Sequence, residues 1–142
     1  MSNVYDTLAE RGFVYQVTDE AGLREALERP LTLYCGYDAT SNSLQVGNMV
    51  SVMMLAHMQR AGHRPIALIG GGTTLVGDPS GRTSSRPILS KEQVQTNKEG
   101  IREQLARFLD FSDDRALMLD NADWLTRLNY IDFVRDIGRH FS

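Results

Sequence analysis

The chain has 142 residues, of which 42% are hydrophobic and 23% charged, with a net charge of -3 and a single cysteine. This length suits one globular domain, and no apolar run approaches the roughly 18 residues that suggest a membrane span. One cysteine excludes an internal disulfide and a cysteine-based zinc site. The 13 arginines and two lysines are scattered among acids, which excludes a basic stripe typical of nucleic-acid binding.

The first 30 residues predict a short helical segment. Residues 4–28 form two helical patterns, the second with Thr18 at its N-cap and acidic residues in its first turn. Residues 31–142 predict the core of the domain. The N-terminus lacks the basic flank, apolar centre and cleavage site of a secretory signal, so we expect a cytoplasmic protein.

A strand, a helix and a second strand open the core. Residues 31–37 alternate apolar and polar side chains, residues 46–61 form a Met-rich and largely buried helix, and residues 65–71 are apolar on both faces. This order predicts a right-handed crossover and an α/β fold with a parallel sheet. Residues 71–90 read as a mostly irregular loop, whose length favours a functional role.

The remaining elements follow from end signals and periodicity. Ser90 and Gln93 form a capping box that predicts a helix to about Leu109. Residues 116–120 predict a third strand, and residues 121–140 are helical in character. Three loops therefore follow three parallel strands, and such loops converge on a ligand crevice at the carboxyl ends of the strands.

The first of these loops leads into a helix through Gln45, Gly47 and Asn48. Free backbone N–H groups at a helix start attract phosphate, and a glycine lets the backbone approach a ligand closely. The alternative is structural, because Asn42 and Gln45 have the spacing of a capping box. Both interpretations stay open from the spacing alone.

The second loop is rich in glycine but lacks the lysine of a Walker loop and the last glycine of a dinucleotide fingerprint. Asp78 in this loop would repel a triphosphate and would pair well with an ammonium group, or would simply cap a turn. Arg82 and Arg86 are either solvated charges or mobile cations beside a phosphate site. Tyr34 would reach the crevice from its strand, or would pack half-buried with one hydrogen bond.

Taken together, the chain resembles the front part of a bacterial tyrosyl-tRNA synthetase, a class I aminoacyl-tRNA synthetase. The resemblance covers essentially the whole chain. Its blocks are LYCGYDATSNSLQVGN, QRAGHRPIALIGGGTTLVGDPSGR, DNADWL and NYIDFVRDIGRHFS, in the family's order and spacing. It implies a Rossmann-type (HUP-like) parallel sheet with flanking helices, the first half of the class I catalytic domain.

The resemblance also implies roles for particular residues. Tyrosine would be bound by Tyr34, Asp78, Leu68 and Asn121. ATP and the adenylate would be bound by Gly36, Asp38, Thr40, Gly47 and Ser51. The catalytic positions would be Gln45, Asn48, Arg82 and Arg86. The family's HIGH tetrapeptide is here Gln45-Val46-Gly47-Asn48, so both histidines are replaced by amides. A neutral amide in place of an imidazole predicts slowed activation.

The implied function is that of a tyrosine–tRNA ligase. Its partners would be L-tyrosine, ATP accompanied by Mg²⁺, and tRNA(Tyr), with no protein-bound metal, no membrane contact and a homodimer at full length. The two lysines, Lys91 and Lys98, leave no room for the KMSKS loop, and the anticodon-binding domain is also missing. We therefore expect an N-terminal fragment that is inactive alone. The alternatives are a non-catalytic fragment or paralogue that acts as a binding or folding unit, and a related class I enzyme such as a tryptophanyl-tRNA synthetase.

Overall fold

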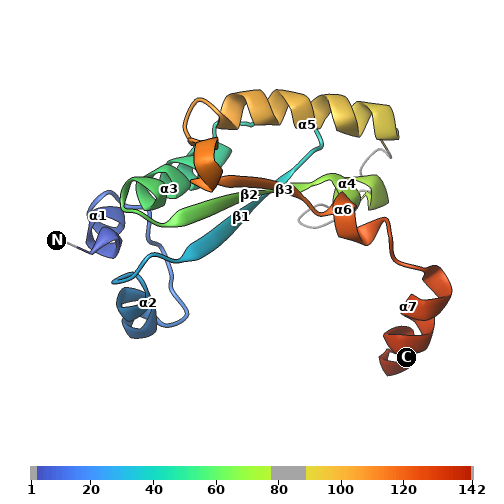
Figure 1. The fold of residues 1–142 in the computed structure, drawn as a ribbon, viewed down its shortest axis with the longest axis horizontal. Coiled ribbons are helices and arrows are strands. Elements are labelled where there is room, and N and C mark those ends of the chain that lie inside the picture. Colours follow the sequence, from blue (N-terminus) through green and yellow to red (C-terminus); the bar gives the residue numbers. More distant parts are fainter. Residues whose placement is uncertain (1–2, 78–88, 142) are drawn as a thin grey trace.

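The computed structural model describes residues 3–77 and 89–141. Its centre is a parallel sheet of three strands, in the order β1-β2-β3 (Figure 1). The strands are β1 (Thr32–Asp38), β2 (Arg64–Gly70) and β3 (Leu117–Asp120). The predicted α/β fold with a parallel sheet is confirmed. β2 is the central strand, and its residues 65–70 are all buried or half-buried, which fits its continuous apolar sequence.

Two helices cover one face of the sheet. They are α3 (Asn48–Arg60) and α5 (Lys91–Leu105), which lie together on the same side (Figure 1). The main core forms between them and the sheet. Its most buried large side chains include Leu55 of α3, Ile69 of β2, and Ile101 and Leu105 of α5. Fully burying such a side chain contributes about 1.5–3 kcal/mol, so this contact is the main reason for the layered arrangement.

The opposite face of the sheet is open within the described part of the chain. In the parallel register Tyr34 pairs with Ile66, and Gly36 pairs with Leu68. Paired residues point to the same side of a sheet, which is the side away from the core. Tyr34 is 70% exposed and Leu119 of β3 is 39% exposed. The predicted site residues Tyr34 and Gly36 of β1 therefore lie on a face that α3 and α5 leave uncovered.

The N-terminal segment forms a second, smaller core against α3. It contains α1 (Val4–Glu10) and α2 (Glu20–Ala26). Arg24 joins the two helices, because its guanidinium lies 2.6 Å from the Asp6 carboxylate and 4.1 Å above the Tyr5 ring. The N-cap of α2 is Asp19 rather than the predicted Thr18, since the Asp19 carboxylate accepts a hydrogen bond from the Gly22 N–H.

The prediction of an irregular loop after β2 is wrong for the first part of that stretch, because residues Gly71–Val76 form helix α4. Glycine is a poor helix former, so local propensity opposed this helix. The helix ends at Gly77, whose φ of 76° is the left-handed conformation that glycine adopts without strain. Its first turn is supported by the side chains of Asp120, the last residue of β3, and of Asn121.

The other boundaries differ from the predictions by a few residues. The capping box of Ser90 and Gln93 is confirmed, but α5 ends at Leu105 and not near Leu109. Helix α3 begins two residues later than predicted and ends one residue earlier. The helical stretch after β3 is divided into α6 (Ala122–Leu125), α7 (Tyr130–Asp136) and the 3-10 turn η2 (Gly138–His140), and a 3-10 turn η1 (Ser112–Asp114) precedes β3. Asn129 causes the main break, since it caps α7.

Apolar side chains of α7 are exposed, among them Tyr130, Ile131 and Phe133. Figure 1 shows that α7 extends away from the sheet and from α5. In the two described stretches, no helix has the length and hydropathy needed to cross a bilayer.

Candidate active site

A cleft of about 710 Å³ lies at the carboxyl ends of the strands. This is the position that the loop argument predicted. Segments that are far apart in the sequence meet in its wall. Predicted site residues in the lining are Gly36, Asp38, Thr40, Gln45, Asn48, Leu68 and Asn121. Of the predicted site residues within the described ranges, Tyr34, Gly47 and Ser51 are not in the lining.

The β1–α3 loop has a different geometry from the predicted capping box. Helix α3 begins at Asn48 with Gly47 at its N-cap, and its N-cap makes no side-chain hydrogen bond. Asn42 therefore does not cap this helix. Instead, the Asn48 side chain turns back along the chain, and its Oδ1 accepts a hydrogen bond of 3.0 Å from the Gln45 N–H. The capping-box interpretation of Asn42 and Gln45 is wrong, because the N-cap of α3 is Gly47, five residues after Asn42.

The Gln45 side chain is exposed and forms no hydrogen bond with any residue that the structure describes. Gly47 is equally open, since a Cβ there would meet nothing within 4 Å. Ser51 lies one turn into α3 and donates its hydroxyl to the Asn48 carbonyl at 2.9 Å. The start of α3 thus presents an amide side chain and accessible backbone to the cleft region.

Tyr34 lies on the open face of the sheet, as its position opposite Leu33 and Cys35 predicted. Its side chain is 70% exposed, so the alternative of a half-buried packing residue is wrong for this chain. Leu68 lies on the same face, on the neighbouring strand. The two side chains therefore flank the same stretch of uncovered sheet, and Leu68 extends this surface into the cleft.

Asp38 closes the carboxyl end of β1 and lies against the start of α4. A Cβ on Gly70 would meet the Asp38 Oδ1 at 3.1 Å and the Thr73 Oγ1 at 2.8 Å. Only a glycine leaves room for these polar groups at the end of β2. The close approach brings the end of β1 and the start of α4 to one side of the cleft.

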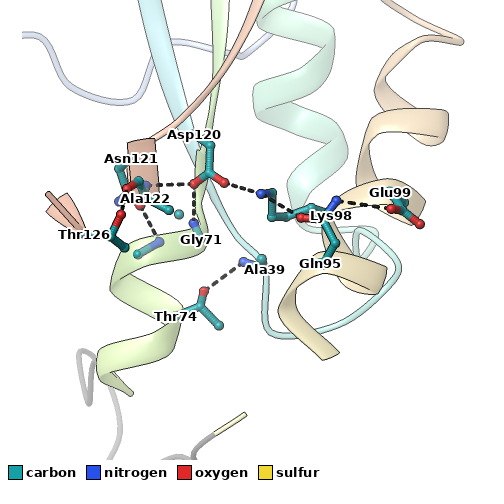
Figure 2. A network of polar contacts seen from close by, with 12 residues as sticks. Ala39, Gly71, Thr74, Gln95, Lys98, Glu99, Asp120, Asn121, Ala122 and Thr126 are labelled. Carbon is teal, nitrogen blue, oxygen red and sulfur yellow. Dashed lines mark hydrogen bonds and ion pairs between the residues drawn. The ribbon is translucent and has the colours of Figure 1, made fainter. Parts of the chain in front are cut away.

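Asp120, the last residue of β3, and Asn121 after it hold the first turn of α4 (Figure 2). Asp120 is 9% exposed, and its Oδ1 accepts hydrogen bonds from the N–H groups of Gly71 and Ala122 at 3.1 and 2.9 Å. Its Oδ2 forms an ion pair with the Lys98 ammonium group from α5. A Cβ on Gly71 would lie 2.5 Å from Asp120 Oδ1, so this close contact requires glycine.

Asn121 continues the same support. Its Oδ1 accepts from the Gly72 N–H at 2.7 Å, and its Nδ2 donates to the Thr73 hydroxyl at 3.1 Å. The Gly71 and Gly72 N–H groups lie at the start of α4, where backbone N–H groups have no partner within the helix. Asn121 does line the cleft, as predicted, but its side chain is already engaged in positioning α4.

Sequence reasoning missed Asp120 and Lys98. A carboxylate at the end of a short apolar strand was a usable signal for Asp120. Nothing in the sequence indicated that Lys98, 22 residues earlier, would lie beside it. Thr73 and Thr74 of α4 and Ser41 and Ser43 of the first loop also line the cleft without having been singled out.

Electrostatically, the described lining of the cleft contains Asp38 and no lysine, arginine or histidine. Tyr37 lies at the cleft but is 2% exposed, and burial raises its pKa, so its hydroxyl stays neutral. In the described ranges, no group of three or more His, Cys, Asp or Glu residues is arranged to hold a metal ion. The described lining therefore offers no cationic side chain to a ligand.

The predicted residues Asp78, Arg82 and Arg86 lie outside the described residues. The described residues nearest to this segment on either side, Gly77 and Leu89, both line the cleft.

The chain is similar in sequence to tyrosine–tRNA ligases and in structure to tyrosyl-tRNA synthetases. Relatives include a tyrosine–tRNA ligase of Syntrophus aciditrophicus with 57% identity over the whole chain and one of Clostridium botulinum (strain Eklund 17B) with 56%. The chain spans only 33% and 35% of these two proteins. A truncated mitochondrial tyrosyl-tRNA synthetase of Aspergillus nidulans has a similar structure, with a TM-score of 0.82, 25% identity and coverage of 100% of this chain and 44% of that one.

A second truncated mitochondrial tyrosyl-tRNA synthetase, from Coccidioides posadasii, has a TM-score of 0.77 at 24% identity, which supports the fold. It is covered over 41% of its length by the whole of this chain. The family model described as tRNA synthetases class I (W and Y) matches residues 25–142. Since this model matches most of the chain, the chain belongs to the class I tRNA synthetases of the W and Y family.

Proposed function

We propose that the whole protein is a tyrosine–tRNA ligase and that this chain contributes the first part of its active site. The observation that carries the proposal is the convergence of Gly36, Asp38, Thr40, Gln45 and Asn48 on one cleft, next to the open sheet face of Tyr34. The relatives with 57% and 56% identity are named tyrosine–tRNA ligases, which supports the same function.

The reaction has two steps. A carboxylate oxygen of tyrosine attacks the α-phosphorus of ATP, the bond to the β-phosphate oxygen breaks, and pyrophosphate leaves with the bonding pair. A ribose hydroxyl of tRNA(Tyr) then attacks the tyrosyl carbonyl and displaces AMP. The first step needs no general acid or base, because the nucleophile and the leaving group are already anions, so positioning and charge stabilisation determine its rate.

We assign the residues as follows. The Tyr34 hydroxyl hydrogen-bonds the substrate phenol, with Leu68 beside the ring, and Asp78 binds the ammonium group. Gly36, Asp38, Thr40, Gly47 and Ser51 line the ATP site, which takes ATP with Mg²⁺. Gln45 and Asn48 donate amide hydrogens to the phosphates. Arg82 and Arg86 supply positive charge to pyrophosphate. The described lining of the cleft contains no basic side chain that could supply this charge.

Asn121 has a double role in this assignment. Its amide positions α4 through Gly72 and Thr73, and the same residue lines the cleft, where we assign it to the substrate pocket. We expect the isolated 142-residue chain to be inactive, because its sheet face at Tyr34 is open. At full length we propose a homodimer, in which the exposed apolar side chains of α7 are covered. The location is the cytoplasm, where bacterial tRNA is charged.

The test is amino-acid-dependent exchange between ATP and labelled pyrophosphate, measured on the full-length protein with tyrosine, phenylalanine and tryptophan. We expect exchange with tyrosine and rejection of phenylalanine by about 10⁴–10⁵-fold, because a site that hydrogen-bonds a hydroxyl leaves buried polar groups unpaired without it. Tyr34→Phe should reduce this discrimination. Equal exchange with tryptophan would show a tryptophan enzyme, and no exchange with any amino acid would show that the family's chemistry has been lost.

A further inference from the structure

The loop that joins β1 to α3 forms a large part of the cleft wall. Thr40, Ser41, Ser43, Leu44 and Gln45 all line the cleft. This stretch has neither helical nor strand structure, so no regular ladder of backbone hydrogen bonds determines its position. Its position must be set by contacts with its surroundings.

One side of α5 supplies such contacts at both ends of the loop. Asn97 donates its Nδ2 to the Ala39 carbonyl at 2.8 Å. Gln104 accepts a hydrogen bond of 2.8 Å from the Leu44 N–H and donates its Nε2 to the Ser43 hydroxyl at 3.0 Å. Residues 97 and 104 are two helical turns apart and lie on the same side of α5. Figure 1 shows the loop passing from β1 to α5 before it reaches α3.

Gly100 lies between these two residues on the same side of the helix. A Cβ at this position would overlap the Asn42 carbonyl oxygen, which is backbone and cannot rotate away. The loop backbone therefore rests directly on the helix backbone. The loop thus contacts one row of residues on α5, made of Asn97, Gly100 and Gln104. This row lies beside the apolar stripe of α5, whose core residues are Val94, Ile101 and Leu105.

We propose that Asn97, Gly100 and Gln104 are positioning residues for the activation step. They hold the loop against α5 and thereby fix where Gln45 meets the phosphates. The inference rests on the proposed function, since it assigns these residues to the same reaction. The two hydrogen bonds of Gln104 end at Ser43 and Leu44, directly before Gln45, so this end of the row is closest to the reacting groups.

The decisive variants are Gly100→Ala and Gln104→Leu in the full-length enzyme. Alanine is a better helix former than glycine by about 1 kcal/mol, so Gly100→Ala should not weaken α5 itself. It should instead push the loop away, and a displacement of about 1 Å at an active site costs up to roughly 100-fold in rate. We expect kcat for pyrophosphate exchange to fall about 10- to 100-fold in both variants, with KM for tyrosine unchanged.

Two controls separate positioning from a general loss of structure. Glu103→Leu places the same side chain next to Gln104, at an exposed position, and should leave kcat unchanged. Gln104→Glu keeps an acceptor for the Leu44 N–H, and the Ser43 hydroxyl can become the donor, so this variant should recover most of the lost rate. Active-site titration of the adenylate gives the fraction of folded enzyme. A fall in kcat that only follows the active fraction would overturn the proposal.

Hydrogen exchange measured by mass spectrometry tests the loop without using activity. Residues 40–45 should exchange faster in both decisive variants, while α3 and α5 stay protected. Unchanged exchange in this stretch, or unchanged kcat in both variants, contradicts the proposal. If the wild-type enzyme activates no amino acid, the proposed function is wrong, and faster hydrogen exchange still shows that the row positions the loop.

Discussion

The side-chain Oδ1 of Asn48 accepts a hydrogen bond of 3.0 Å from the backbone N–H of Gln45. The first and last residues of the tetrapeptide are therefore joined in a closed turn. Asn48 uses its acceptor for this turn and keeps its Nδ2 hydrogens as donors. Gln45 contributes only its backbone to the turn, so its side chain is available for a ligand at the cleft.

Gln45 stands at the position of the first histidine in the family's HIGH tetrapeptide. We expect Gln45→His in the full-length enzyme to raise the rate of ATP–pyrophosphate exchange. Complete loss of an oxyanion donor costs about 2.7–4 kcal/mol, and a glutamine is a weaker donor rather than none, so the gain should stay below that range. Gln45→Leu is the matched control and should lower the rate. No gain in the histidine variant would mean that the amide already serves the transition state fully.

The two halves of the Asn48 amide can be tested separately. Asn48→Asp keeps an acceptor for the Gln45 N–H but removes the donor and adds a negative charge. Asn48→Ala removes both. If Nδ2 donates to the phosphates, both variants should lose exchange activity, by up to about 10²–10³-fold for a lost donor. Only Asn48→Ala should loosen the turn, seen as faster hydrogen exchange at Gln45. Wild-type activity in Asn48→Asp would reduce the role of Asn48 to closing the turn.

Because Asp120 and Lys98 form an ion pair, we expect substitutions of these two residues to have coupled effects on the free energy of unfolding. Asp120→Asn keeps the acceptor for the Gly71 and Ala122 N–H groups and removes only the charge. Breaking a buried pair costs about 3–5 kcal/mol, and the side-chain exposures of 12% and 26% reduce this to about 2–3 kcal/mol through solvent screening. The measurement is the free energy of unfolding in urea.

A double-mutant cycle completes this test. The double variant, with Asp120→Asn and Lys98→Met, should lose less free energy of unfolding than the sum of the losses in the two single variants. Lys91→Met is the control, since Lys91 is exposed and is the other lysine of the chain. Additive costs for Asp120 and Lys98 would show that the pair contributes no coupling.

His63 predicts a dependence of stability on pH. The side chain is 5% exposed, its Nδ1 accepts a hydrogen bond of 3.4 Å from the Leu31 N–H, and burial lowers its pKa below 6.5. In the unfolded chain the imidazole takes up a proton at a higher pH than in the folded protein. Stability should therefore be complete above about pH 6.5 and fall as the pH drops, by at most about 1.4 kcal/mol per pH unit.

The His63→Asn variant isolates this contribution. The asparagine amide oxygen can accept from the Leu31 N–H but does not titrate near neutral pH. Unfolding followed between about pH 5 and 8 should show a smaller slope in the variant. A residual slope is expected from His57, whose pKa is lowered by burial and by the charges of Arg11 and Arg60. Identical slopes in the two proteins would assign the pH dependence elsewhere.

Local patterns were sufficient for much of the fold. The alternation in residues 31–37, the apolar run of β2 and the capping box of Ser90 and Gln93 each depend on neighbours within a few residues, and each is confirmed. The position of the cleft followed from a general property of parallel sheets, whose carboxyl ends share one edge. The resemblance of the blocks to a family of synthetases also came from the sequence alone and is confirmed by the family match.

Tertiary structure decided what depends on residues far apart in the chain. Helix α4 forms against its own glycine-rich sequence, because Asp120 and Asn121 accept hydrogen bonds from its first N–H groups 49 residues away. The β1–α3 loop is held by Asn97 and Gln104, at separations of 58 and 60 residues. Such contacts leave no periodic trace in the sequence, since each requires one side chain to reach one backbone group in space. The sequence alone therefore determined the family and most of the elements, while the tertiary contacts determined helix α4 and how the cleft is held in place.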